Sequence, residues 1–290
     1  MKRINNIFVI GGAGFIGANL IQRLKGTLSI KIICLDNYYT GDHNKHIPDV
    51  TYKVCSTFDE NDLRACFEQW EPTLVFHFGE YARVIPSFND RRYVFKSNLS
   101  GTANVINLCL EYNSMLIYSA SSSKFGGNEN LSPYSWSKAK MVELIKNYGE
   151  WGDLNYQICY FYNVYGKGEC AVGDYATVIA KFKHQYKNNL PLTVVGDGKQ
   201  TRQFTHVYDI IDALFKIMVY KEKNQEWHLT SGKTYSILEV ARMFSDNIKF
   251  IPKNKGERQN VTDVTNKTNI KLDWKPKRTL IDYILGTKST

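Results

Sequence analysis

Tyr134 and Lys138 are the residues of this 290-residue chain whose types and spacing point most directly to chemistry. On a helix, a separation of four residues places both side chains on one face. The lysine ammonium would favour the phenolate and lower the tyrosine pKa, so that the tyrosine could act as a base near neutral pH. Such pairs also occur by chance on helix surfaces, so the meaning of this one depends on the elements that position it.

Two features directly before the pair would bring it to a reaction centre. The stretch 118–123 begins like the end of a buried strand and continues as a serine-rich loop. A hydroxyl in this loop could share a substrate proton with the tyrosine. Pro133 precedes Tyr134 directly and is typical of the first turn of a helix.

The N-terminal region predicts a dinucleotide-binding unit. Residues 7–10 are an apolar run suited to a buried parallel strand, and a segment with helical periodicity occupies 18–24. Between them, Gly11 permits a tight turn, Gly14 lets the backbone approach a pyrophosphate, and Gly17 allows close packing of helix and strand. The helix N-terminus would offer free N–H groups to the phosphates.

A second apolar strand at 31–35 ends in Asp36, at the distance expected for a carboxylate that binds a ribose 2′-hydroxyl. Without this order of elements, the glycines would indicate only a turn between strand and helix. A carboxylate at this position would repel a 2′-phosphate. We therefore expect NAD rather than NADP.

The composition is ordinary for a globular protein, with 43% hydrophobic and 22% charged residues. The net charge of +9 would suit an anionic partner. However, the basic residues are dispersed and do not alternate with aromatic residues, so we expect no nucleic-acid partner.

No apolar run approaches the length of a membrane span, and the N-terminus leads directly into a strand. We therefore expect a cytoplasmic protein without a membrane partner. The six cysteines are scattered and include no Cys-x-x-Cys pair, which indicates reduced, mostly buried thiols and no metal site. His77 and His206 lie in apolar surroundings without ligand spacing, so packing is the expected role of both.

Together, the glycine motif and the Tyr-x-x-x-Lys pair resemble the extended short-chain dehydrogenase/reductase family, specifically its nucleotide-sugar epimerases and dehydratases. The resemblance covers nearly the whole chain. It implies an α/β fold: a Rossmann-type, doubly wound parallel sheet at 1–167 and a smaller C-terminal α/β cap for the substrate at 168–290, with segments that can return to the first domain. It also implies NAD as cofactor, a nucleotide-diphosphate sugar (a UDP-sugar favoured) as substrate, and a homodimer.

The resemblance assigns roles to individual residues. The expected cofactor-binding residues are Gly11, Gly14, Phe15, Ile16, Gly17, Asp36, Asn37, Phe78, Gly79, Asn98, Ser119, Tyr134 and Lys138. The expected substrate-binding residues are Arg83, Ser121, Ser122, Asn163, Val178, Val194, Arg202 and Arg258. Ser121 is the expected catalytic hydroxyl because it stands five residues before Gly126, the glycine of the triplet that corresponds to the family's Val-Tyr-Gly. Ser122 and Ser123 could instead be loop hydroxyls that satisfy backbone groups.

Three of these residues have a plainer interpretation that the sequence leaves open. Asn98, in the family's Asn-x-x-Gly-Thr segment, could equally cap the helix expected at 103–110. Asn163, in an Asn-Val-Tyr-Gly tetrapeptide, could be only a turn residue. Arg202, in a segment resembling Gly-Asp-Gly-x-x-x-Arg-x-Phe, is expected on the substrate pyrophosphate but could be a surface arginine after a tight turn.

The chain departs from the family pattern at several positions. Glu80 follows the buried strand expected at 74–78, where relatives carry small residues; its carboxylate could stabilise a positive nicotinamide or face solvent. Ser56 stands where relatives often place an aspartate on adenine, a contact that could move to Asp59. Lys124 could reach substrate or be a solvated loop lysine, and Tyr160 replaces the usual arginine.

These features predict a nucleotide-sugar 4-epimerase that acts through a transient 4-keto intermediate, with Tyr134 as base, assisted by Lys138 and Ser121. A 4,6-dehydratase would need an acidic pair after Ser121, where this chain has two serines. A 4-keto reductase would most often use NADPH, which Asp36 disfavours. A catalytically silent NAD-binding regulator would have lost the Tyr/Lys pair. All three stay open as alternatives, as do the sugar and the nucleotide base.

Overall fold

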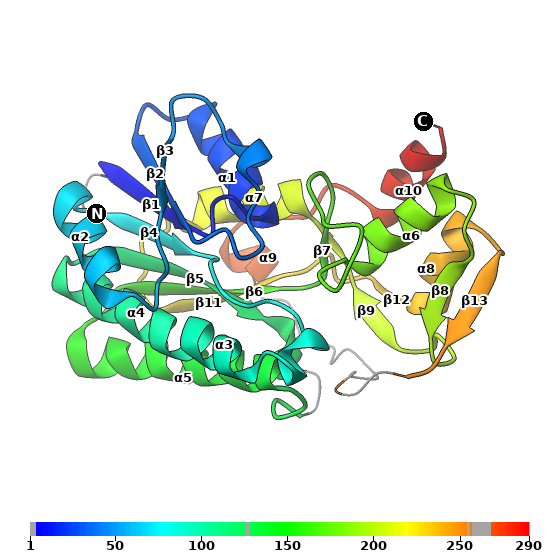
Figure 1. The fold of residues 1–290 in the computed structure, drawn as a ribbon. Helices are drawn as coiled ribbons and strands as arrows, with labels where there is room; N and C mark the ends of the chain where they lie inside the picture. The colour runs from blue at the N-terminus through cyan, green and yellow to red at the C-terminus, as the bar shows by residue number, and fades with distance from the viewer. Residues whose placement is uncertain (1–3, 126–127, 254–255, 257–267, 290) are drawn as a thin grey trace.

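A seven-stranded parallel sheet forms the centre of the computed structural model, which describes residues 4–125, 128–253, 256 and 268–289 (Figure 1). Its strands are β1 (Asn6–Ile10), β2 (Lys31–Asp36), β3 (Thr51–Val54), β4 (Leu74–His77), β5 (Met115–Ser121), β6 (Tyr156–Phe161) and β11 (Gln225–Leu229). Their order across the sheet is β3-β2-β1-β4-β5-β6-β11. This order confirms the predicted doubly wound α/β fold.

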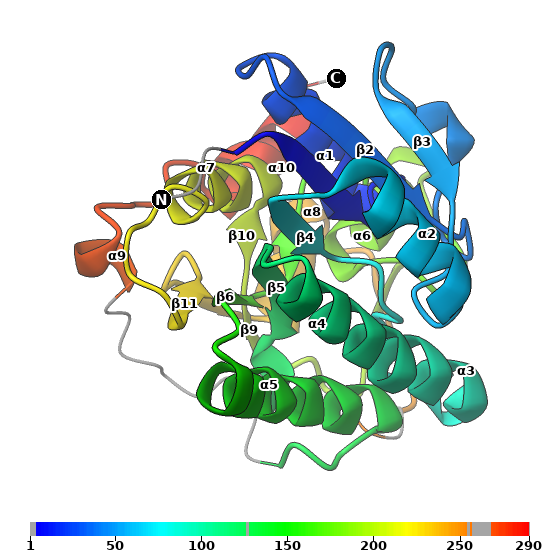
Figure 2. The same ribbon diagram turned by 90° about the vertical axis from the view of Figure 1, so that its left-hand side faces the viewer.

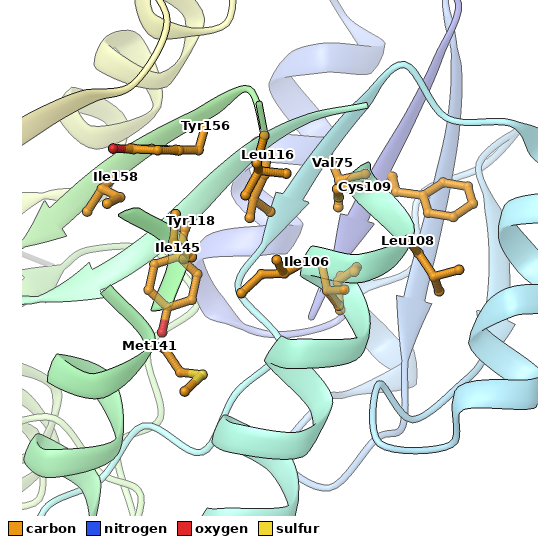
Figure 3. Close-up of a cluster of buried hydrophobic side chains, with 14 of the residues drawn as sticks. Val75, Ile106, Leu108, Cys109, Leu116, Tyr118, Met141, Ile145, Tyr156 and Ile158 are labelled. Carbon is orange, nitrogen blue, oxygen red and sulfur yellow. The ribbon is translucent and has the colours of Figure 1, made fainter. Parts of the chain in front are cut away.

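Helices cover both faces of the sheet, so that it is the middle of three layers (Figure 2). On one face lie α1 (Phe15–Lys25) and α7 (Val207–Ile217); on the other lie α2 (Glu60–Trp70), α4 (Thr102–Glu111) and α5 (Pro133–Gly152). Successive side chains of a strand point to opposite faces. Accordingly, Ile7 and Val9 join the apolar cluster under α1 and α7, and Phe8 joins the cluster under α2, α4 and α5. Figure 3 shows part of this second cluster, with Ile106 and Ile145 facing the sheet.

A short helix and a π-helical segment lead into α4. These are α3 (Arg91–Phe95) and the segment Lys96–Gly101. Short 3₁₀ turns occur at His43–Lys45, Pro86–Phe88 and Ser122–Phe125.

The C-terminal part adds a smaller layer beside the sheet, built around a third cluster of buried apolar side chains (Figure 1). Its strands are β7 (Val164–Tyr165), β8 (Leu192–Val195), β9 (Thr201–Gln203), β10 (Thr205–His206), β12 (Thr234–Ser236) and β13 (Ile248–Ile251), and its helices are α6 (Val178–Lys187), α8 (Ile237–Phe244) and α10 (Leu280–Lys288). The short helix α9 (Thr268–Lys271) instead contacts β11 of the large sheet. These strands pair as β7–β10, β8–β13 and β9–β12. Ser236 caps α8.

β11 and α7 follow residue 168 in the chain but join the large sheet, β11 as a strand parallel to β6 and α7 as a covering helix. The predicted division at residue 167 stays a prediction. Among the described residues no helix is both long and apolar enough to cross a membrane. All six cysteines are free thiols, and five of them are buried as expected.

The direction of strand progression reverses between β1 and β4. In such sheets ligands bind in the crevice outside the carboxyl ends of the strands at this point. The loops after β1 and β4 touch there, because a Cβ on Gly11 would lie 2.5 Å from the backbone nitrogen of Gly79. The fold therefore places the glycine motif, Glu80 and the serine loop after β5 at the carboxyl ends of neighbouring strands of the sheet.

Candidate active site

Helix α5 carries Tyr134 and Lys138 in its first two turns. Ser132 caps the helix by accepting a hydrogen bond from the backbone N–H of Ser135 (3.1 Å), and Pro133 occupies the first turn as predicted. The helix packs on β5, which places the pair beside the serine loop. Tyr134 is half-buried and Lys138 is buried, so the tyrosine is the member of the pair that can meet a ligand.

The Lys138 ammonium is bound on several sides. It donates hydrogen bonds to the Glu80 carboxylate and to the backbone carbonyl of Ser119, and its Nζ lies 4.2 Å from the centre of the Tyr118 ring. Burial lowers the pKa of Lys138, and the negative charge of Glu80 opposes this decrease. The Lys138 ammonium is thus buried, and Glu80, the Ser119 carbonyl and the Tyr118 ring fix its position.

Glu80 lies inside the protein, with its side chain only 2% exposed. One oxygen, Oε2, binds Lys138, and the other, Oε1, accepts hydrogen bonds from the Tyr118 hydroxyl (2.9 Å) and the Thr102 hydroxyl (3.0 Å). The interpretation that Glu80 faces solvent is therefore wrong. The sequence held one signal for this position: Glu80 follows β4, and the neighbouring strand β5 carries Tyr118, whose hydroxyl is one of the donors to Glu80.

The serine loop holds its hydroxyls in different ways. Ser119 donates its hydroxyl hydrogen to the carbonyl of His77 (2.9 Å), and Ser121 Oγ accepts from the backbone N–H of Ser123 (3.2 Å). Ser122 is buried. The buried Ser123 hydroxyl has no hydrogen-bond partner among the described residues. The expectation that this hydroxyl satisfies a backbone group is therefore wrong.

Asn98 lies within the π-helical segment and is fully buried. Its Oδ1 accepts from the backbone N–H of Tyr81 (2.8 Å), while Nδ2 donates to the Tyr81 carbonyl (3.0 Å) and to Ser137 Oγ (3.1 Å). Gly101, not Asn98, is the cap residue of α4, so the interpretation as a cap is wrong. Asn98 instead joins the loop after β4 to the helix that carries Tyr134 and Lys138.

The turn between β1 and α1 has the form of a phosphate cradle. Helix α1 begins at Phe15 after Gly14, and no side chain in the described part of the chain caps its first N–H groups. Only the Gly11 carbonyl oxygen, at 3.1 Å, lies near the place where a Gly14 Cβ would stand, so a ligand can approach this backbone. Free N–H groups and the positive end of a helix dipole suit a pyrophosphate. The expected residues Phe15, Ile16 and Gly17 form this first turn.

Asp36 ends β2 and closes the turn from the other side. Its carboxylate accepts hydrogen bonds from the backbone N–H groups of Ala13 (2.9 Å) and Tyr38 (2.8 Å). Burial raises the pKa of Asp36, and the two backbone donors oppose this increase. Asn37 follows and donates to the Tyr93 hydroxyl (3.0 Å). Together with the cradle, these residues fit a dinucleotide.

Arg83 donates from Nε and Nη2 to the Tyr175 carbonyl (2.9 and 2.6 Å) and from Nη1 to that of Ala82 (2.8 Å). Burial lowers its pKa. Its guanidinium therefore ties the loop after β4, which also contains Phe78 and Gly79, to the segment before α6. A direct role on substrate stays a prediction.

Asn163 is a turn residue with φ of +32°, and it also donates to the Gln203 carbonyl (2.8 Å). That contact links β7 to β9, where Arg202 donates to the Thr201 carbonyl (2.7 Å). Val178 begins α6.

Two expected substrate contacts need comment. Val194 is fully buried in the apolar cluster of the C-terminal layer, and its expected role at the substrate stays a prediction. Arg258 lies outside the described residues.

Asp59 and Tyr160, two further positions discussed for the family pattern, have partners in the structure. Asp59 caps α2 by accepting from the N–H of Asp62 (3.2 Å), and Tyr160 donates to Glu226 (2.6 Å). Lys124 is half-buried. His77 is buried as expected, and His206 caps α7. No metal-binding group of three or more His, Cys, Asp or Glu side chains occurs in the described ranges.

Comparisons with known proteins show the family of the chain. Residues 7–237 match the NAD dependent epimerase/dehydratase family. The "Putative UDP-glucose 4-epimerase" of Methanocaldococcus jannaschii is 28% identical over 257 residues, which cover 84% of this chain and 83% of that protein.

Two solved structures share the fold. The UDP-glucose 4-epimerase of Thermotoga maritima with UDP-glucose has a TM-score of 0.91 at 23% identity, covering 98% of this chain and 97% of the other. The UDP-N-acetylglucosamine 4-epimerase of Methanobrevibacter ruminantium in complex with UDP-N-acetylmuramic acid has a TM-score of 0.86 at 25% identity, covering 98% and 96%.

Proposed function

This chain belongs to the NAD-dependent epimerase/dehydratase family, and we propose that it is a nucleotide-sugar 4-epimerase that acts through a transient 4-keto sugar. The observation that carries the proposal is the half-buried Tyr134 one helical turn from a buried, charged Lys138, beside the serine loop. NAD is the cofactor; when bound, it supplies the reversible oxidation at C4.

The residues of the chain would move and hold one proton. Tyr134 accepts the proton of the C4 hydroxyl as C4 becomes a carbonyl, and it returns this proton when C4 is reduced from the opposite face. Lys138 stabilises the phenolate through its charge. Ser121 Oγ hydrogen-bonds the C4 oxygen and so keeps it in reach of Tyr134.

Epimerisation is favoured over 4,6-dehydration because the described site offers no carboxylate that is available for dehydration. Dehydration needs acidic side chains after the catalytic hydroxyl, where this chain has Ser122 and Ser123. The nearby carboxylate of Glu80 is held by Lys138 and two hydroxyls, so it is not available to move protons at C5 or C6.

A UDP-hexose or a UDP-N-acetylhexosamine is the substrate that we propose, supported by the names of the similar proteins. Arg202, and Arg258 with it, would bind the diphosphate, because a guanidinium fork matches phosphate oxygens. We place the enzyme in the cytoplasm, which agrees with its free thiols. Assembly into a homodimer stays a prediction.

Product analysis tests the reaction directly. Purified protein is incubated with UDP-glucose, UDP-N-acetylglucosamine and their galacto epimers, without added cofactor, and products are followed by proton NMR. We expect interconversion of at least one pair, because the cofactor is regenerated in each cycle. Failure to convert any of the four, even with NAD added, would reject these substrates.

Replacement of the proposed base tests the residue assignment. Tyr134→Phe removes the hydroxyl and keeps the ring, so turnover should fall by at least about 10²-fold. NAD content of the purified variant should equal that of the wild type, since the cradle is unchanged. An active Tyr134→Phe protein would overturn the assignment of Tyr134.

A further inference from the structure

A buried ion pair joins Glu80 and Lys138, with side chains only 2% and 6% exposed. An ammonium group removed from water loses a large hydration energy, so a buried lysine without a partner tends to release its proton. A carboxylate in contact reverses this tendency.

The Glu80 carboxylate is itself fixed by donors from two other elements. Its Oε1 accepts from the Tyr118 hydroxyl of β5 (2.9 Å) and from the Thr102 hydroxyl of α4 (3.0 Å). Because Thr102 has only one hydroxyl hydrogen, its oxygen accepts from His77 Nε2, which lies 3.0 Å away. This assignment places the ring hydrogen of His77 on Nε2. The hydroxyl hydrogens of Thr102 and Tyr118 therefore both point toward the Glu80 carboxylate.

We propose that Glu80 is a positioning residue that keeps the Lys138 ammonium charged and fixed one helical turn from Tyr134. The proposal rests on the roles proposed above for Tyr134 and Lys138. In this arrangement Glu80 acts only through the lysine. Loss of its charge would change the pH range in which the lysine can support the tyrosine.

The other titratable groups around the pair keep one charge state over the range of interest. His77 on β4 is neutral above about pH 5, because burial lowers its pKa to about 4. Tyr118 on β5 is neutral, since burial and then the charge of Glu80 raise its pKa well above the ordinary value. Tyr160 on β6 likewise has its pKa raised, mainly by burial. A change at Glu80 should therefore alter the pH profile through Lys138.

The pKa of Lys138 is lowered by burial and supported by Glu80, so Glu80→Gln lowers it further. The alkaline limb of the kcat/KM profile should then move to lower pH, by at least about one unit. Stability should also depend on pH in this variant. A folded state in which the lysine pKa is lowered loses stability as pH falls. The melting temperature of Glu80→Gln should therefore lie further below that of the wild type near about pH 6 than near about pH 9.

Two further variants complete the experiment with the full-length protein. Glu80→Asp keeps the charge but shortens the reach, so its limb should move in the same direction by a smaller amount. Glu143→Gln is the matched control, because it removes the carboxylate partner of Lys140 on the exposed face of the same helix. An exposed pair contributes little, so this variant should keep the wild-type limb and show no pH-dependent deficit.

An unmoved alkaline limb in Glu80→Gln, or a melting deficit equal at all pH values, would overturn the proposal, because lost packing alone gives that result. If Glu80→Gln does not fold, the alkaline limb of the kcat/KM profile of Glu80→Asp tests the proposal instead. A limb shifted to lower pH supports the proposal, and an unmoved limb rejects it. The melting experiment needs no substrate. Failure of the epimerase proposal and failure of this one are therefore distinguishable.

Discussion

Ser121 and Ser123 are near neighbours in the loop after β5, but their hydroxyls have different surroundings. Ser121 Oγ accepts a hydrogen bond from the backbone of Ser123 and is the proposed partner of the substrate oxygen. Ser123 Oγ is buried without a hydrogen-bond partner in the described part of the chain. A buried hydroxyl without a partner lowers the stability of a protein.

The two serines give a matched pair of alanine variants. Ser121→Ala should reduce kcat by roughly 10²-fold, because a proton-sharing group is lost. Ser123→Ala should keep kcat. It should lower the free energy of unfolding by no more than about 0.5 kcal/mol, and it could raise it, because a buried hydroxyl without a partner is removed. Turnover assays and urea titrations of both variants check this. Equal losses of activity would mean that the loop, rather than the Ser121 hydroxyl, is what the reaction needs.

The sequence was sufficient to predict Tyr134 and Lys138 as candidate catalytic residues. It was not sufficient to predict the side chains that contact them. A spacing of four residues reports a helix face, and the structure places both residues on α5. The pairing of Glu80 with Lys138 joins residues 58 positions apart and depends on how α5 packs on β5, beside the loop after β4. The strand order brings Tyr118 close to Glu80, but no local pattern predicts that α5 brings Lys138 to the same place.

At the scale of elements, the turn between β1 and α1 shows two different uses of glycine. A Cβ on Gly17 would lie 2.3 Å from the Gly11 carbonyl oxygen, so this glycine is needed for packing within the protein. A Cβ on Gly14 would meet only that same oxygen, at 3.1 Å, and would otherwise project into the place proposed for the phosphates. The first position concerns the fold, and the second concerns the ligand.

Alanine at the two positions should therefore separate folding from cofactor binding. Gly14→Ala should keep the melting temperature of the apoprotein within a few degrees and weaken NAD by about tenfold or more, roughly 1.4 kcal/mol. Gly17→Ala should lower the free energy of unfolding by about 1–3 kcal/mol through overpacking. Calorimetry with NAD and thermal melts measure both effects. Unchanged NAD affinity in Gly14→Ala would remove the cradle from the proposed cofactor site.

Most elements around the site could be predicted because periodicity and caps are local signals. The strand at 7–10 and the helix start at Pro133 both appear in the structure. The π-helical segment Lys96–Gly101 was not predicted. Its Asn98 bonds to the backbone of Tyr81 and to Ser137, contacts that exist only after three elements have packed together.

The helices α3, α4 and α5 lie side by side on one face of the molecule (Figure 2), and two of them carry exposed aromatic side chains. Phe95 at the end of α3 is 38% exposed, and its ring lies edge-on to Trp136 of α5 with 5.6 Å between ring centres. Trp151 near the end of α5 is also exposed. Aromatic side chains on neighbouring helices are frequent anchors of protein interfaces. This layer is where the predicted homodimer would form.

A charge placed in the proposed interface tests this assembly. Wild-type protein at micromolar concentration should sediment with twice the mass of one chain, and Phe95→Glu should shift it toward the monomer, because a buried carboxylate without a partner opposes association. Ile270→Glu is the control: Ile270 is 88% exposed on α9, which Figure 2 shows on the opposite side of the molecule from α3. A monomeric wild type contradicts the homodimer. A Phe95→Glu protein that stays dimeric, like the control, would move the interface to another face.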